Sequence, residues 1–296
     1  MLSRLPPNVA GALLMMASMA AFTINDTFVK LVGQTIPLFQ LLTLRAILAT
    51  LFLAVLAWRL GTFRLSMPRH DRWLVFWRCV AEVGAAYFFL SALLVMPLAN
   101  VTAILQVLPL TVTLGAALFF REAVGWRRML AICAGFCGML LIVRPGPDGF
   151  TTHAIYALAA VACVTLRDLV TRRMSVNVSS MTVTVITSAS ILVCAALASL
   201  TIDWQPVSAR EGLYILASAI FVIGGYSFSV MVMRVGEISA IAPFRYSSLL
   251  WALLLGWLVF GDWPDAITLT GAAIVVASGL FTLYRERRVK KRRKPV

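Results

Sequence analysis

Two short polar stretches place acidic and basic side chains inside otherwise apolar segments of the chain. Asp26 and Lys30 lie near the end of the first apolar run, and Asp168 and Arg172 hold the same places 142 positions later. Charged groups inside apolar segments are costly to bury and usually serve a function. An acid that is shielded from water can also take up and release a proton. This repeated pair therefore predicts gating of a polar solute or proton coupling.

Further charged residues lie deep in apolar segments. Because a helix rises about 1.5 Å per residue, the position of a residue in its segment gives its depth. One predicted set, nearer one membrane face, is Asp26, Lys30 and Arg45. A second set, nearer the other face, is Arg78, Glu82, Arg167, Asp168 and Arg245. We expect the two sets to line a polar cavity and to act as alternating gates. The alternative to gating is that acids and bases four residues apart on one helix form ion pairs with a purely structural role.

Two prolines, Pro109 and Pro243, interrupt apolar segments at corresponding places. Each removes a backbone hydrogen bond and kinks its helix, and such breaks often lie beside substrate sites. Kinks without a binding role also occur in membrane helices. Aromatic rings offer flat apolar area with a polar handle, although core packing is the alternative for each ring. The expected solute contacts are Arg45, Glu82, Tyr87, Gln106, Tyr226, Arg245, Tyr246, Ser247 and Trp251.

The composition is that of a membrane protein. Hydrophobic residues make up 61% of the chain and charged residues 13%, with a mean hydropathy of +0.91. The net charge of +14 comes mostly from the C-terminal tail and from connections between apolar segments. Membrane orientation explains that excess, so no nucleic-acid partner is predicted. All five cysteines lie in apolar runs, and neither His70 nor His153 has a metal-ligand or triad spacing. We predict no metal, no cofactor and no enzymatic activity.

Ten apolar segments are long enough to cross a bilayer. They are residues 9–33, 36–58, 73–94, 97–120, 127–143, 152–173, 180–200, 212–233, 238–260 and 266–284. The first is expected to be an uncleaved span and not a signal peptide. On the fifth and tenth segments, Ala134 with Gly138 and Ala273 with Ala277 predict faces for close helix packing.

Basic residues collect in alternate connections, which predicts the orientation of the chain. These connections hold Arg59, Arg64, Arg69, Arg72, Arg121, Arg127, Arg128, Arg172, Arg173 and Arg234. The opposite connections hold the acids Asp148, Asp203, Glu211, Asp262 and Asp265. The pattern places both termini in the cytoplasm and the protein in the cytoplasmic (inner) membrane.

The repeat divides the ten spans into two halves of five. We predict an all-α integral membrane protein with repeats at residues 1–144 and 145–285, followed by a basic tail at 286–296. An odd number of spans in each half inverts the second half in the membrane. Inverted repeats are typical of secondary transporters, which expose a central site to each side in turn.

Motifs near the ends of the two halves match one another. The first half carries Pro97-Leu-Ala-Asn-Val-Thr-Ala, Leu108-Pro109-Leu-Thr-Val and Phe120-Arg-Glu122. The second carries Ser239-Ala-Ile-Ala-Pro243, Leu254-Leu-Gly256-Trp and Phe260-Gly-Asp262. In these motifs, and over nearly its whole length, the chain resembles the ten-helix branch of the drug/metabolite transporter superfamily, which has two EamA domains. Asp262 stands where that family more often has Glu.

The resemblance implies alternating-access transport of a small polar organic metabolite. Relatives carry amino acids, nucleotide-like solutes, S-adenosylmethionine, riboflavin and other metabolites, some inward and some outward. The aromatic and basic residues favour a vitamin or nucleoside-like heterocycle such as riboflavin. An amino acid or S-adenosylmethionine carrier is an alternative, and so is a non-transporting membrane scaffold or receptor. The expected partners are the small-molecule substrate and the lipid bilayer. Proton coupling, transport direction and the choice between monomer and homodimer stay open.

Overall fold

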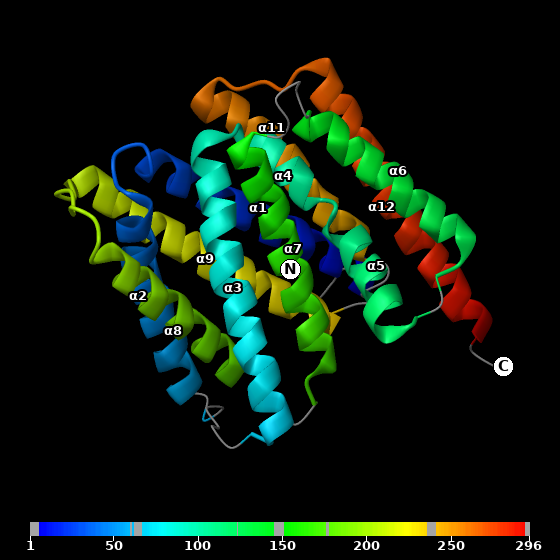
Figure 1. Ribbon diagram of the computed structural model, residues 1–296, viewed down its shortest axis with the longest axis horizontal. Coiled ribbons are helices and arrows are strands. Elements are labelled where there is room, and N and C mark those ends of the chain that lie inside the picture. Colours follow the sequence, from blue (N-terminus) through cyan, green and yellow to red (C-terminus); the bar gives the residue numbers. More distant parts are fainter. Residues whose placement is uncertain are drawn as a thin grey trace. The chain divides into compact units, whose positions relative to one another are not determined.

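The computed structural model describes residues 6–59, 61, 67–122, 124–144, 151–175, 178–235 and 241–293. Its elements are α1 (Pro7–Val32), α2 (Leu38–Arg59), α3 (Arg69–Val95), α4 (Leu98–Leu105), α5 (Leu108–Phe120), α6 (Trp126–Val143), α7 (Thr152–Arg173), α8 (Ser180–Ser199), α9 (Ala209–Val235), the 3₁₀ helix η2 (Ala242–Tyr246), α11 (Ser247–Phe260) and α12 (Ala266–Arg293) (Figure 1). Arg64, Asp148 and Ser239, named above, lie outside the described residues.

The ten predicted spans are confirmed. Within the described part of the chain, ten helical stretches are long and apolar enough to cross a membrane. The fourth combines α4 with α5, and the ninth combines η2 with α11. The last helix differs from the prediction because α12 continues through most of the basic tail, to Arg293.

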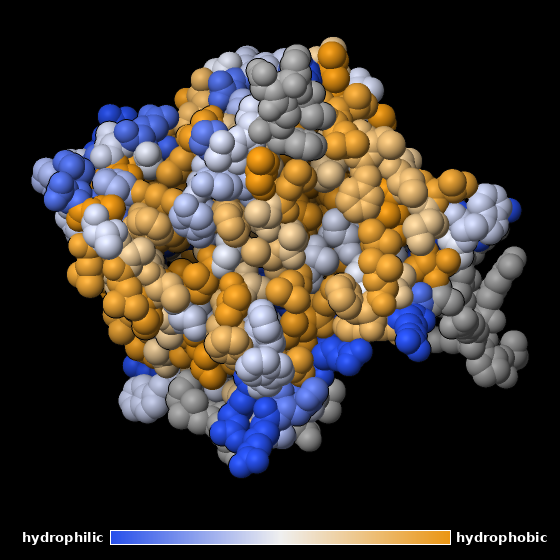
Figure 2. Space-filling view, in the orientation of Figure 1, coloured by the Kyte–Doolittle hydropathy of each residue, from blue (hydrophilic) through white to orange (hydrophobic). Residues whose placement is uncertain are grey.

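Many large apolar side chains lie on the outer surface of these helices. Leu51 is 63% exposed, Phe119 is 72% exposed and Leu200 is 80% exposed. Figure 2 shows the resulting broad apolar areas on the visible face. A soluble protein rarely exposes so much contiguous apolar surface, so these faces meet lipid. The protein is a multi-pass membrane protein.

The helices form two compact units that differ from the two sequence halves. The first unit contains residues 1–27, 96–154 and 220–296, and the second contains residues 28–95 and 155–219. Each unit therefore takes segments from both halves of the sequence. The helices α1 and α9 each contribute to both units.

In the first unit, α6 packs along α12 (Figure 1). A Cβ atom added to Gly138 would lie 2.8 Å from the carbonyl oxygen of Gly271, so the two backbones are in direct contact. Of the predicted packing residues, Gly138 lies in this contact, whereas Ala134, Ala273 and Ala277 are exposed, so the rest of the predicted register was wrong. Small residues one position away, among them Gly135 and Ala272, are the buried ones.

In the second unit, α8 packs against α2 and α3. Gln40 at the start of α2 is fully buried and binds the backbone of Gln205 at both ends of its amide. Its Nε2 donates to the carbonyl oxygen of Gln205 at 2.7 Å, and its Oε1 accepts from the Gln205 N–H at 2.9 Å. This pair fixes the connection between α8 and α9 against α2.

Two spans are broken near the prolines. In the fourth span, α4 ends at Leu105, and α5 then starts at Leu108 with Pro109 in its first turn. In the ninth span, Pro243 lies in η2, which gives way to α11 at Ser247. Proline lacks an N–H and is tolerated in the first turn of a helix, where no partner is needed. The same residue type thus marks a helix restart in both halves.

The matching Phe-Arg-Glu and Phe-Gly-Asp motifs form the ends of α5 and α11. Arg121 and Gly261 both have positive φ, at 55° and 71°. The residue after Arg121 donates its N–H to the carbonyl oxygen of Ala116 at 3.4 Å, and the residue after Gly261 donates to Gly256 at 3.0 Å. A residue in the left-handed conformation directly after the last turn is a common end of a helix C-terminus. The motif therefore stops the helix in each half.

Candidate functional site

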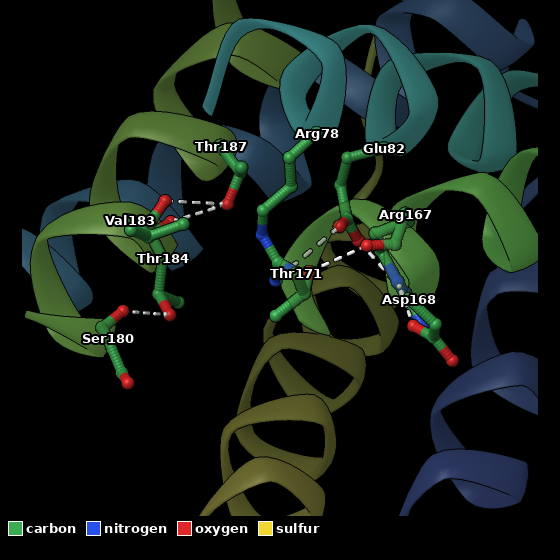
Figure 3. A network of polar contacts seen from close by, with 9 residues as sticks. All are labelled: Arg78, Glu82, Arg167, Asp168, Thr171, Ser180, Val183, Thr184 and Thr187. Carbon is green, nitrogen blue, oxygen red and sulfur yellow. Dashed lines mark hydrogen bonds and ion pairs between the residues drawn. The ribbon is translucent and has the colours of Figure 1, made fainter. Parts of the chain in front are cut away.

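Four of the predicted intramembrane charges come together in the second unit. Figure 3 shows Arg78 and Glu82 of α3 pointing toward Arg167 and Asp168 of α7. The Glu82 carboxylate lies 3.3 Å from Nη1 of Arg167 and 3.9 Å from Nη2 of Arg78. Arg167 also binds Asp168 at 2.9 Å. We call Arg78, Glu82, Arg167 and Asp168 the charge network.

The charge network is only partly satisfied by its own members. Nη1 of Arg78 donates to the hydroxyl of Thr171, which in turn donates to the carbonyl oxygen of Arg167 at 2.6 Å. Among the described residues, Nε of Arg78 and Oε2 of Glu82 are buried with no hydrogen-bond partner. Buried polar atoms normally find partners, so these two atoms are suited to receive a polar group from water or solute. The four charges sum to zero, which suits a solute with little net charge.

The pairing within the charge network differs in part from the sequence prediction. Arg78 and Glu82, four residues apart on α3, do form an ion pair, although it is the longest in the network. Asp168 forms an ion pair with its neighbour Arg167. The contact of Glu82 with Arg167 crosses from α3 to α7, and spacing along a single helix gave no sign of it.

The first predicted gate residues lie on α1. Lys30 is only 6% exposed, and its Nζ donates to the carbonyl oxygen of Leu93 at 3.0 Å. Asp26 accepts a hydrogen bond of 2.8 Å from the side chain of Asn25. Asp26 belongs to the first unit and Lys30 to the second. Burial of the Lys30 ammonium group is costly, and this backbone carbonyl offsets part of the cost.

Two other predicted residues lie in the second unit at different degrees of burial. Arg172 is exposed in the last turn of α7, where a basic side chain favours the negative end of the helix dipole. Arg45 is half-buried on α2.

An aromatic cluster surrounds Tyr87 of α3 in the same unit. The ring of Tyr87 stacks on Phe39 with centroids 5.8 Å apart, and it lies 6.1 Å from the ring of Tyr156 of α7. Phe39 and Tyr87 also line a cavity of about 220 Å³ between α2, α3 and α8. Its other walls are apolar or weakly polar, including Leu42 and Cys194. Glu82 precedes Tyr87 by little more than one helical turn, so the aromatic cluster and the charge network share α3.

A second group of polar side chains gathers at the helix breaks of the first unit. Nε2 of Gln106 donates to Oγ of Ser248, 142 positions away. This bond therefore joins the broken span of the first half to the broken span of the second. The Tyr246 hydroxyl, Oγ of Ser247 and Oδ1 of Asn100 are buried without a hydrogen-bond partner in the described part of the chain. Such atoms beside broken helices are suited to bind a polar solute.

The other predicted contacts of the first unit are more exposed. Arg245 is exposed in η2, and Trp251 is half-buried on α11. Tyr226 is 52% exposed, and its ring meets that of Phe22 edge to face at 5.1 Å.

Besides the rings of Phe39 and Tyr156, three polar residues of the site were missing from the sequence prediction. Asn100 and Ser248 join the polar group at the helix breaks, and Thr171 binds Arg78. Ser248 lies five residues after Pro243, and its place beside the helix break was the only signal for it. Thr171 follows Asp168 on α7, but neither composition nor spacing distinguished it from other helical threonines.

The fold and the intramembrane polar groups define a membrane carrier of solutes. The EamA-like transporter family matches residues 9–144 and 151–284, which together cover nearly the whole chain. The chain therefore belongs to this family, within the drug/metabolite transporter superfamily, and is a transporter and not an enzyme. Its two matched regions correspond to the two halves of the helical repeat.

Several characterised relatives are similar over most of their length. An S-adenosylmethionine uptake transporter of Rickettsia felis is 24% identical over 68% of each chain. A riboflavin transporter of Vibrio cholerae is 27% identical over 73% of each chain. The pseudopaline exporter CntI of Pseudomonas aeruginosa is 24% identical over 91% of this chain and 94% of its own. A solved crystal structure shares the fold with a TM-score of 0.64 at 17% identity, covering 95% of this chain and 99% of its own.

Proposed function

We propose that this protein is a secondary transporter that moves a small polar organic metabolite across the cytoplasmic membrane by alternating access. Residues 1–144 and 145–285 would be its inverted repeats. The observation that carries the proposal is the charge network, with two buried polar atoms that lack a hydrogen-bond partner among the described residues. A purely structural set of ion pairs would be expected to satisfy such atoms.

The polar group at the helix breaks of the first unit is a separate set of proposed solute contacts. Gln106, Tyr246 and Ser247 would contact the solute, with Asn100 beside them. Broken helices in transporters expose backbone and side-chain polar groups at the depth of the substrate. Arg245 and Trp251 would contribute charge and a flat ring from the same segment.

The proposed substrate class is a vitamin or nucleoside-like heterocycle such as riboflavin. Tyr87, Phe39 and Tyr156 provide ring faces one helical turn from Glu82, a combination that suits a flat solute with polar substituents. The riboflavin transporter among the relatives supports this choice, and the S-adenosylmethionine transporters support the nearest alternative with similar identity. An amino acid is the third solute to test.

The proposed gates are Asp26 with Lys30 on α1 and Asp168 with Arg172 on α7. Lys30 is buried, and Asp168 belongs to the charge network. Glu82, Asp26 or Asp168 would carry a proton if transport is coupled to a proton gradient. The distribution of basic residues supports cytoplasmic termini.

Flux into proteoliposomes tests this proposal. Purified protein would be reconstituted and offered labelled riboflavin, S-adenosylmethionine and a mixture of amino acids, with and without an imposed proton gradient. Saturable accumulation of one solute above that of protein-free vesicles is expected. Loading the solute inside and measuring its exit gives the direction. No saturable flux of any of these solutes in either direction would contradict the proposed substrate class.

A further inference from the structure

The first three turns of α3 carry a continuous exposed face that takes no part in the charge network. The residues of this face recur at intervals of three and four, which places their side chains on one side of the helix. All of them are exposed. In chain order they are Arg69, Arg72, Trp73, Phe76, Trp77 and Val80. The face therefore changes from charged to aromatic to apolar along a membrane span.

Three rings pack against one another on this face. Trp73 stacks on Phe76 with ring centroids 5.4 Å apart, and Trp77 meets these two rings edge to face at 5.8 and 5.9 Å. In chain order the three residues are 59%, 51% and 39% exposed. Rings of this size are normally covered when they serve a protein core, so this group is presented to the bilayer. We call Trp73, Phe76 and Trp77 the ring group.

Two arginines precede the ring group. Neither the Arg69 nor the Arg72 guanidinium forms an ion pair or a hydrogen bond with another residue in the described part of the chain. Because a helix rises about 1.5 Å per residue, Trp73 lies about 6 Å further into the span than Arg69, and Phe76 lies about 10 Å further. The positive charges are thus at the depth of lipid headgroups, and the rings are just below them. Figure 2 shows hydrophilic surface over the beginning of α3, next to apolar surface.

The opposite face of the same turns is buried in the protein. Asp71, Val75 and Cys79 are each at most 9% exposed. Oδ2 of Asp71 accepts from the hydroxyl of Ser175 at 2.7 Å, and Oδ1 accepts from its backbone N–H at 3.1 Å. Asp71 is the only acid in the sequence of residues 69–80, and these bonds hold it on the buried side. The exposed face therefore carries positive charge that no acid of these turns neutralises.

We propose that this face is a binding site for an anionic phospholipid. The guanidinium groups of Arg69 and Arg72 hold the phosphate, since arginine binds phosphate oxygens with paired, charge-assisted hydrogen bonds. The ring group packs against the glycerol backbone and the first part of the acyl chains. A soluble phosphate compound would meet the arginines but gain nothing from the exposed rings, so a lipid is the ligand that fits the whole face.

The simpler alternative is an interfacial belt of aromatic residues that anchors the helix in any lipid. Only a headgroup site discriminates between anionic and zwitterionic lipids, because each arginine near the membrane surface attracts a negatively charged lipid. Two such attractions together predict a preference of about tenfold or more for the anionic lipid.

Photo-crosslinking of the full chain in lipid nanodiscs tests the site. The nanodiscs would contain a trace of phosphatidylglycerol or phosphatidylcholine with the same photoreactive acyl chain, and labelled peptides would be mapped by mass spectrometry. Phosphatidylglycerol should label residues 69–80 about tenfold more than phosphatidylcholine does. The double variant Arg69→Gln, Arg72→Gln should abolish this excess. Arg127→Gln is the matched control and should leave it unchanged, since the Arg127 guanidinium lies 5.2 Å over a single exposed ring, that of Trp126.

Equal labelling of residues 69–80 by both lipids, or an excess that survives the double variant, would overturn the site. Loss of the excess in Arg127→Gln as well would show a general effect of charge and would also overturn it. Glycerol phosphate, which lacks acyl chains, should not reduce the labelling, and competition by it would assign the face to a soluble phosphate compound instead. Weak labelling by both lipids, with a dimer in native mass spectrometry that Trp77→Ala abolishes, would assign the face to a second copy of the chain. Both arginines are exposed, so the double variant should fold normally.

Discussion

Gly279 of α12 leaves no room for a side chain beside Tyr246. A Cβ atom at this position would lie 1.6 Å from the Tyr246 hydroxyl oxygen and 2.5 Å from Cζ. Since ordinary contacts of this kind begin near 3.4 Å, the phenol would have to move by about 2 Å. Tyr246 is only 6% exposed, so it has little space to move into. Gly279→Ala therefore displaces one of the proposed solute contacts.

The expected change in stability of Gly279→Ala follows from two opposing effects. Overpacking a buried site costs about 1–3 kcal/mol, while alanine favours a helix over glycine by about 1 kcal/mol. A net loss of about 1–2 kcal/mol should lower the apparent Tm of the purified protein in detergent by several degrees. Solute flux should fall as well, because the hydroxyl of Tyr246 and the neighbouring Ser247 leave their positions.

The matched control is Gly224→Ala on α9, where a Cβ atom meets nothing within 4 Å. This variant should be as stable as the natural chain or slightly more stable, with normal flux. If Gly279→Ala matched Gly224→Ala in both Tm and flux, the close packing of Tyr246 on α12 would be refuted. A fall in Tm with unchanged flux would keep the packing and remove Tyr246 from the solute site.

Three other changes have defined outcomes. Arg121→Gly should raise the unfolding free energy by about 1 kcal/mol, because glycine adopts the positive φ of this helix end without strain; an unchanged or lower chemical-denaturation midpoint would contradict this. The Arg144 guanidinium lowers the pKa of Asp265 from 3.8 to about 2. The ion pair therefore stabilises the fold fully at pH values above 3.8, and this stabilisation is lost as the pH falls through about 2. The Tm deficit of Asp265→Asn should then be present at neutral pH and vanish near pH 2, and a deficit that is constant with pH would show that the ion pair is not its cause. Gln40→Ala removes both bonds to Gln205 and should cost about 1–3 kcal/mol, measured by thermal unfolding against Gln34→Ala, an exposed glutamine.

The spans and their breaks were predictable because they depend on local properties. Apolar length fixes a membrane helix, and proline cannot continue one, so the ten spans and the restart at Pro109 follow from composition. The intramembrane charges were also visible, since Glu82 or Lys30 stands out in an apolar run. What could be seen was which residues are unusual and in which segment they lie.

The partners of those residues were not predictable, because they come from distant segments. Spacing suggested that Glu82 pairs with Arg78 on its own helix, yet the shorter contact is with Arg167 of α7. The register of α6 on α12 was missed for a similar reason. Several small residues line each helix, and only the direct contact of Gly138 with Gly271 decides which face is buried. Asp71 was overlooked because an acid at a helix start looks like an ordinary loop charge.

The most direct test of the account is the initial rate of solute counterflow in proteoliposomes for Glu82→Gln and the natural chain. The amide cannot neutralise both guanidinium groups, so we expect a fall of at least about tenfold with normal membrane insertion and a normal elution profile. Asp203→Asn, an exposed acid in the α8–α9 connection, is the control and should keep the full rate. Full counterflow by Glu82→Gln would contradict the claim that the charge network takes part in transport.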